Sequence, residues 1–286
     1  MKTLREALFN KKTLKNNVNA KYEFTGETMN YHGHTLHRIR ALRSLICDVI
    51  MGEEGGWIES ENNLDQEGHA WVFDEAKVFD RAYLYGDAQI SGKSCVYGDA
   101  QVYGDAQVFG DAIISNNAKV YDEAKVYGNA QVRDDAQVYG NALVYNDAII
   151  GHNAKVYEDA ILFDGAEVYG NAQVHGSAKV NGDAEVYGHC NLFGNAHVYS
   201  KCRVFGNAQV YGNAQIYDEA KVCVNAQVYG NAQVFGHAKI CDNAKVFGNA
   251  IIRDQVEVRN NAKVYGNSEI RSDYKIEKDV KDQKIK

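Results

Sequence analysis

The chain of 286 residues contains no proline. Average usage of about 5% predicts roughly fourteen prolines at this length. Because proline has no backbone N–H to donate, its absence indicates that almost every backbone donor is needed in hydrogen-bonded ladders. The missing residue type therefore favours β-sheet along most of the chain.

Other features are scarce too, and each scarcity excludes a class of protein. No window is long and apolar enough to span a membrane, and the basic stretch at 1–17 lacks the continuous apolar run of an export signal. The net charge of -7 argues against a dedicated nucleic-acid or anionic-membrane binder. Six cysteines at irregular positions do not suggest a secreted disulfide framework. We therefore expect free thiols, a cytoplasmic location, and neither a nucleic-acid nor a membrane partner.

The dominant feature of the sequence is a six-residue repeat. A small residue recurs every six positions from Ala70 to Ser268 without a slip, and an aliphatic residue follows two positions later, from Val72 to Ile270. Residues two apart on a strand share one face, so both point to the same side. The next two positions are mostly Gly-Asp or Gly-Asn, which tolerate the left-handed backbone of a corner. Each hexad is therefore predicted to form a short strand followed by a corner.

These hexads, written VYGNAQ or VYGDAQ in this chain, resemble the hexapeptide-repeat family over residues 68–270. The resemblance implies an all-β fold, a single-stranded left-handed parallel β-helix with three hexads per triangular coil. The hexads would make about eleven coils, with neighbouring strands about 4.8 Å apart. Handedness comes from the resemblance alone. The run NYHGHTLHRIRAL to GGWIESENNL, leading directly into hexads, also resembles the YdcK-like proteins, a bacterial group labelled acyltransferases by fold analogy.

The two ends of the chain lack the hexad. We expect residues 1–20 to form a short amphipathic helix and residues 21–67 to form a small N-terminal β cap, with Trp57 and Trp71 supplying bulk that covers the first coil. Residues 271–286 form a charged tail that would blunt the last coil. Such caps are needed because terminal strands of a solenoid otherwise expose unpaired edges.

The residue after each inward aliphatic points outward, and sorting these positions by eighteen gives three walls. The second wall is aromatic but interrupted, for example by Asn181, and the third is mixed. The first wall is aromatic almost without a break, and we predict it as a binding surface: Tyr85, Tyr103, Tyr121, Tyr139, Tyr157, His175, Phe193, Tyr211, Tyr229, Phe247 and Tyr265. Two explanations stay open. In the first, the stacked rings stabilise a flat sheet. In the second, they form an interface.

The unbroken register favours a non-catalytic scaffold or binding protein. An extruded loop, which would help build a small-molecule pocket, would break the six-residue count, and none does. The first wall would then serve self-association or bind a protein or polymer partner. The family resemblance implies a homo-oligomer, with a trimer favoured. We expect no cofactor and no metal in this interpretation.

The alternative function is acyl transfer from acyl-CoA. The resemblance implies a histidine base at a subunit boundary, with acyl-CoA lying along the prism. His197 is the candidate, because it faces outward from the middle of a wall beside Tyr199. His175 replaces one ring of the first wall. The remaining histidines considered occupy corner positions: His69, His152, His189 and His237.

The cysteines fall into two groups. Cys190 and Cys202 occupy the small inward position, where a buried thiol acts as a slightly larger alanine. Cys223 and Cys241 lie eighteen apart on the third wall and are therefore stacked on neighbouring coils. For this pair, inert packing and a labile disulfide both fit, whereas the absence of a nearby histidine or CxxC makes a metal site a poor explanation.

Overall fold

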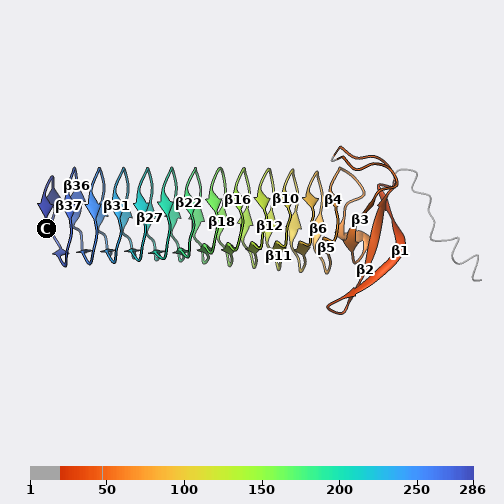
Figure 1. The fold of residues 1–286 in the computed structure, drawn as a ribbon, viewed down its shortest axis with the longest axis horizontal. Helices are drawn as coiled ribbons and strands as arrows, with labels where there is room; N and C mark the ends of the chain where they lie inside the picture. The colour runs from red at the N-terminus through yellow and green to blue at the C-terminus, as the bar shows by residue number, and fades with distance from the viewer. Residues whose placement is uncertain (1–19, 47) are drawn as a thin grey trace, which may run out of the picture.

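The computed structural model describes residues 20–46 and 48–286, so the helix predicted for residues 1–20 falls almost wholly outside the described residues. The molecule is a rod of stacked coils, with an antiparallel β region at one end and the C-terminus at the other (Figure 1). The predicted all-β parallel solenoid with a small N-terminal β cap is confirmed. Among the described residues, no helix is long and apolar enough to cross a membrane.

Three sheets run the length of the rod, one for each predicted wall. The third wall is a 15-stranded sheet: β1 (Tyr22–Tyr31), β2 (His34–Ala41), β3 (Glu54–Ile58), β5 (Lys77–Val78), β8 (Cys95–Val96), β11 (Ile113–Ile114), β14 (Gln131–Val132), β17 (Ile149–Ile150), β20 (Glu167–Val168), β23 (Glu185–Val186), β26 (Arg203–Val204), β29 (Lys221–Val222), β32 (Lys239–Ile240), β35 (Glu257–Val258) and β38 (Lys275–Ile276). The second wall is a 13-stranded sheet: β4 (Trp71–Val72), β7 (Gln89–Ile90), β10 (Gln107–Val108), β13 (Lys125–Val126), β16 (Leu143–Val144), β19 (Ile161–Leu162), β22 (Lys179–Val180), β25 (His197–Val198), β28 (Gln215–Ile216), β31 (Gln233–Val234), β34 (Ile251–Ile252), β37 (Glu269–Ile270) and β40 (Lys284–Ile285). The first wall is a 12-stranded sheet: β6 (Tyr83–Leu84), β9 (Gln101–Val102), β12 (Lys119–Val120), β15 (Gln137–Val138), β18 (Lys155–Val156), β21 (Gln173–Val174), β24 (Asn191–Leu192), β27 (Gln209–Val210), β30 (Gln227–Val228), β33 (Lys245–Val246), β36 (Lys263–Tyr265) and β39 (Val280–Lys281).

The pairing register confirms three hexads per coil. Lys119 pairs in parallel with Gln101 in the preceding coil and with Gln137 in the next, each eighteen residues away. The same spacing recurs in all three sheets from β4 to β38. A constant eighteen-residue step places every side chain directly over its counterpart, which is the basis of all the columns described below.

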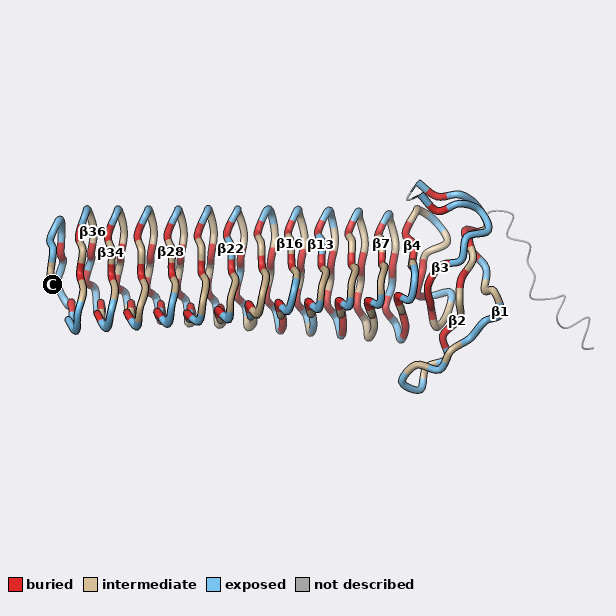
Figure 2. The backbone as a smooth tube through the Cα atoms, in the orientation of Figure 1, coloured by how far each residue is buried: buried red, intermediate tan, exposed pale blue. Residues whose placement is uncertain are grey.

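The core is a column of small and aliphatic side chains inside the coils. Ala100 and Val102 are completely buried, as are nearly all of their counterparts along the rod. Figure 2 shows this pattern, with buried segments recurring within the strands and exposed segments at the corners. Cys190 and Cys202 are buried in the small position, as predicted. At Ser94, another occupant of that position, the hydroxyl donates to the Ser91 carbonyl at 2.8 Å and so keeps its hydrogen bond within the core.

The N-terminal region changes the pairing from antiparallel to parallel. β2 pairs with β1 and β3 antiparallel, and β3 then pairs parallel with β5 of the first complete coil. Buried Lys21 closes this end, because its Nζ donates to the carbonyls of Ala70 at 2.9 Å and Glu67 at 3.2 Å. Trp71 is fully buried, whereas Trp57 packs with Leu36 and Phe79 in a separate cluster.

The solenoid continues beyond the last hexad, so the rod is longer than the roughly eleven coils that the hexads alone predict. Residues of the charged tail form β38, β39 and β40 and make a final, tighter coil. Val280 pairs with Val264, sixteen residues away, and Ile285 pairs with Ile270, fifteen residues away. The hexad pattern is too weak in these strands for periodicity to predict them. They form because the preceding coil offers unpaired backbone groups with which they can hydrogen-bond.

Candidate functional site

The eleven rings of the first wall stack into one unbroken column, which we call the aromatic ladder. Consecutive ring centroids from Tyr85 to Tyr265 lie 4.6–5.4 Å apart, and adjacent ring planes are within 13° of each other. The coil spacing of a parallel sheet falls within the distance range of favourable ring pairs. The ladder is therefore a direct consequence of placing one ring per coil at a constant register.

Stacking changes what the first wall presents to solvent. All eleven rings are half-buried, because each inner ring has both faces covered by its neighbours and exposes mainly its edge. Burial, with smaller contributions from its neighbours, raises the pKa of Tyr121 to about 12, and burial likewise raises the pKa of Tyr103 and Tyr139. These phenols stay protonated and keep an O–H donor at neutral pH. The wall thus offers ring edges and hydroxyls, and it does not offer free ring faces on which a sugar or base would stack.

A polar column runs beside the aromatic ladder. The strands of the first wall carry glutamine, lysine and asparagine outward, and none of its described strand residues is acidic. Tyr157 Oη donates to Gln173 Oε1 at 3.2 Å, and His175 Nε2 lies 3.0 Å from Asn191 Oδ1. His175 Nδ1 also lies 3.5 Å from the corner carboxylate of Glu158. The structure therefore brings all the predicted binding residues into one strip, and their role in binding stays a prediction.

The other two walls carry only short ladders. On the second wall, the stack from Phe109 to Phe163 ends at Asn181, and a second stack runs from Tyr199 to Phe235. On the third wall, the stacks contain at most three rings, as from Tyr169 to Phe205. A continuous strip of rings is therefore a property of the first wall alone among the described sheets.

His197 lies on β25 of the second wall, beside the gap left by Asn181. Its Nε2 is 2.6 Å from Asn181 Oδ1, and its ring contacts the Tyr199 ring at 4.4 Å. Burial, together with the charge of Lys179, lowers the pKa of His197, so its imidazole is neutral at neutral pH. No carboxylate pairs with His197 within the described part of the chain. The geometry thus supplies a neutral base but no acidic partner to orient it.

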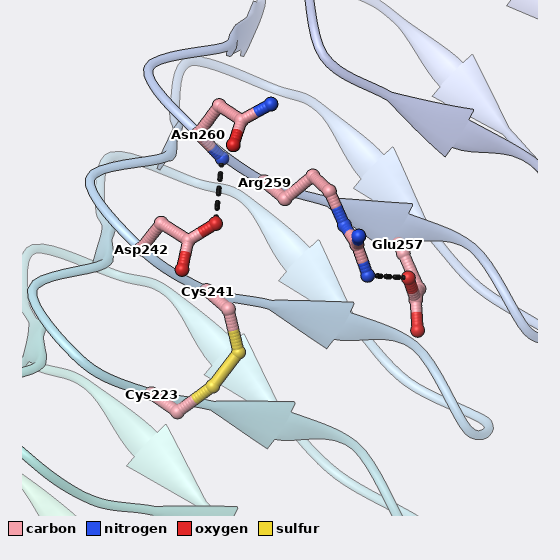
Figure 3. Close-up of a disulfide and its surroundings, with 6 residues drawn as sticks. All are labelled: Cys223, Cys241, Asp242, Glu257, Arg259 and Asn260. Carbon is pink, nitrogen blue, oxygen red and sulfur yellow. Dashed lines mark hydrogen bonds and ion pairs between the residues drawn. A yellow bond between two sulfur atoms is a disulfide. The ribbon is translucent and has the colours of Figure 1, made fainter.

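The cysteines of the third wall correct part of the sequence interpretation. Cys223 and Cys241 form a disulfide between neighbouring coils, with their Cα atoms 4.7 Å apart (Figure 3). Of the two alternatives, the structure therefore contains the disulfide, and the general expectation of free thiols is wrong for this pair. The reason is geometric, since the eighteen-residue step places the two Cα atoms within disulfide range. Burial raises the pKa of the free thiols of Cys190 and Cys202 to about 12, which makes them poor nucleophiles.

Two polar arrangements were not foreseen from the sequence. The first is a ladder of corner asparagines, in which each Nδ2 donates to the next Oδ1 at 3.0 Å: Asn195, Asn213, Asn231, Asn249 and Asn267. Asparagine, unlike aspartate, has both a donor and an acceptor, so it can continue such a ladder without charge repulsion. The signal in the sequence was the preference for Asn over Asp in one column.

The second arrangement joins the cap to the first coil. His34 Nδ1 lies 3.0 Å from Glu59 Oε1, and His34 Nε2 lies 3.6 Å from Asp80 Oδ1. These three side chains bring their ligand-type atoms together, but each imidazole nitrogen faces a different carboxylate. That is the arrangement of an imidazolium bridging two carboxylates, whereas a metal ion would take one nitrogen only. Three separate segments of the chain contribute to the cluster, so no short sequence motif predicts it.

Residues 136–152 match the YdcK Beta solenoid repeat. The matched stretch contains β15, β16 and β17, one strand from each wall, and so corresponds to one complete coil. No curated protein matches the chain. The chain is thus a β-solenoid with a YdcK-type repeat and exposed aromatic ladders.

Proposed function

We propose that this YdcK-type solenoid is a non-catalytic scaffold that associates with further copies of itself through the first wall. The observation that carries the proposal is the aromatic ladder, an eleven-ring strip without a break or an acidic strand residue beside it. Tyrosine edges with hydroxyl groups suit a protein interface, because they combine apolar contact with hydrogen bonding. A continuous apolar strip of this length is also more than a monomer normally exposes.

A second copy is the occupant that best fits the strip. Two or three rods with parallel axes would bring equally long, equally flat walls together, and a closed ring of three copies would cover the aromatic ladder of every copy. The lysine and glutamine column would meet the corner carboxylates of a neighbour, such as Asp105 and Glu123, along the rod. The proposed assembly is therefore a homo-oligomer, with a trimer favoured; a different protein or a polymer on this wall is an outcome of the test below.

The test compares matched ring substitutions on two walls. Tyr121→Glu/Tyr139→Glu/Tyr157→Glu disrupts the first wall, and Tyr127→Glu/Tyr145→Glu/Phe163→Glu introduces the same charge into the second wall in the same part of the rod. Sedimentation equilibrium should show an oligomer for the native chain and the second-wall variant, and a monomer for the first-wall variant. Circular dichroism checks that each variant keeps its β spectrum.

Two outcomes contradict the proposal. One is a native chain that stays monomeric at high concentration, and the other is an oligomer that both variants disrupt equally. Retention of a partner protein or polysaccharide by a monomeric native chain, with loss in the first-wall variant only, would replace self-association with partner binding.

A second candidate function, acyl transfer from acyl-CoA, is favoured by one observation, the neutral and half-buried imidazole of His197. A general base must be neutral at working pH. This function requires that acetyl-CoA or succinyl-CoA raise the melting temperature in a dose-dependent way. It also requires a transferase activity that His197→Ala abolishes while His175→Ala does not; failure of either result excludes it.

A further inference from the structure

Three cations are stacked on successive strands of the third wall. Arg203 of β26 pairs in register with Lys221 of β29, which pairs in turn with Lys239 of β32. Like charges directly opposite each other on neighbouring strands are destabilising. No other column in the described strands places three cations in a row. Such a row along the rod therefore needs a physical reason.

The three side chains line a groove that continues along the neighbouring corner. One hollow, with a volume of about 410 Å³, is lined by Lys201, Arg203, Glu219, Lys221 and His237. An adjoining hollow, of about 440 Å³, shares Lys221 and His237 with the first and is lined further by Lys239, Gln255, Glu257, Asp273 and Lys275. We call this surface the cationic groove; its cations outnumber its carboxylates on a chain whose net charge is -7.

Three carboxylates in and around the cationic groove are engaged with cations or a histidine, which leaves Asp273 as the other carboxylate of its lining. Glu185 pairs with Arg203 at 3.1 Å, Glu219 pairs with His237 at 3.3 Å, and Glu257 pairs with Arg259. The ammonium groups of Lys201, Lys221 and Lys239 have no ion-pair or hydrogen-bond partner among the residues that the structure describes. The groove therefore presents positive charge that the protein itself leaves uncompensated.

The disulfide joins the residues that directly follow β29 and β32, the two strands that carry Lys221 and Lys239. Cys223 follows Lys221 by two residues, and Cys241 follows Lys239 by two. The covalent bond therefore links the two neighbouring coils whose lysines repel each other. Figure 3 shows the bond joining the two coils, with the Glu257–Arg259 pair on the following coil. Because the fold and the disulfide already hold the cations together, a bound anion would not have to assemble them.

We propose that the cationic groove binds a small linear oligophosphate, with its anionic groups along the Arg203–Lys221–Lys239 row. The three cations repeat at the coil spacing of about 4.8 Å, so a linear ligand with several charges meets more than one of them at once. Arginine matches phosphate geometry with two parallel N–H donors, and lysine supplies a point charge. Orthophosphate reaches fewer of the cations and should bind more weakly. The groove lies on a different wall from the aromatic ladder, so the two proposals fail independently.

The experiment is a calorimetric titration of the full chain with sodium tripolyphosphate at low ionic strength and without divalent cations. Tripolyphosphate should bind at least tenfold more tightly than orthophosphate, and added salt should weaken it because charged contacts are screened. Lys221→Gln/Lys239→Gln should lose at least tenfold in affinity. The matched control Lys93→Gln/Lys125→Gln removes the same charge from exposed positions outside both the cationic groove and the first wall, and it should bind within about twofold of the native chain.

A melting experiment separates loss of the site from loss of the fold. Without ligand, Lys221→Gln/Lys239→Gln should melt at the native temperature or higher, since it removes a repulsion. Tripolyphosphate should raise the melting temperature of the native chain and of the Lys93→Gln/Lys125→Gln control but not of this variant. Three results overturn the proposal: no binding to the native chain, equal affinity for orthophosphate, or equal losses in both double variants. Binding of an oligonucleotide but not of tripolyphosphate also overturns it.

Discussion

At the residue scale, the corners show how closely this fold restricts backbone conformation. Most corner residues with positive φ are glycine, aspartate or asparagine, and these tolerate the left-handed region. At Gly104, with φ 68°, an added Cβ would come within 2.8 Å of the Asp122 backbone in the next coil. Val224 departs from this preference, because it is β-branched and yet has φ 64°. Its side chain is substantially exposed, so burial does little to offset the strain.

We predict that Val224→Gly stabilises the protein. Left-handed backbone costs a non-glycine residue about 1–2 kcal/mol, and a glycine avoids this cost. The greater conformational freedom of glycine in the unfolded chain offsets part of that gain in stability. The expected gain is about 0.5–1 kcal/mol, read as a rise in the urea midpoint. Asn260→Gly is the control, because Asn260 lies two coils further in the same column with φ 58° and already tolerates that conformation. A lower midpoint for Val224→Gly would contradict the strain argument.

At the scale of elements, the polar cluster of His34, Glu59 and Asp80 holds the β1–β2 hairpin to the first coil. The hydrogen bond with Glu59 raises the pKa of His34, and the negative charges of Glu59 and Asp80 raise it as well. Burial acts in the opposite direction. Burial alone would raise the pKa of Glu59, but its hydrogen bonds with His34 and the Asp80 backbone lower it overall. Each partner thus stabilises the charged form of the other.

The pKa directions of this cluster predict when the cap is most tightly held. A raised His34 pKa contributes stability that is complete below the unfolded value of about 6.5 and is lost as pH rises through the folded value. A lowered Glu59 pKa contributes stability above the unfolded value of about 4.3 that is lost as pH falls. Hydrogen exchange in residues 22–41, corrected for intrinsic rates, should therefore be slower at pH 6 than at pH 8.

Variants identify the group responsible for that pH dependence. His34→Gln should abolish the difference between pH 6 and pH 8, because it cannot become an imidazolium. His32→Asn, which changes a neighbouring histidine and tolerates its φ of 52°, should preserve the difference. The same pH dependence in His34→Gln as in the native chain would show that the cluster does not hold the hairpin.

At the scale of the whole molecule, the two ends of the rod limit open-ended growth. Lys21 and the β1–β3 region cover the first coil, whereas each strand of the last coil carries a lysine, and acidic residues lie in the segments between these strands. Exposed strand edges pair with other chains unless charges or covering segments prevent it. The final coil pairs with β35, β36 and β37, and we predict that it also prevents end-to-end association.

Removal of residues 272–286 should convert the protein into one that associates end to end. The truncated rod would present the edges of β35 to β37 without the charged coil, and such contacts do not close into a defined oligomer. Light scattering at increasing concentration should show assemblies that keep growing. Lys284→Gln, which keeps the final coil, should behave as the native chain does. A truncated protein with the native distribution of sizes would refute the role assigned to the tail.

The six-residue spacing of the sequence determined the short strands, the corners, and the inward alanine and valine columns, whereas the parallel solenoid with three hexads per coil was implied by the family resemblance. A strand alternates its faces every residue and the six-residue step never slips, so local spacing assigns each side chain to the inside or the outside. The three hexads per coil that the resemblance implies then assign each outward side chain to a wall. The aromatic ladder residues could be named for the same reason.

Only the tertiary structure decided how the columns behave and how the non-repeating ends pack. Ring faces became covered because neighbouring coils lie within stacking distance, and Cys223 and Cys241 joined because the same spacing suits a disulfide. The His34 cluster and the tightened last coil depend on pairings between segments with no common period. Periodicity specifies which way a side chain points, whereas contacts between aperiodic segments follow from the packing of the whole chain.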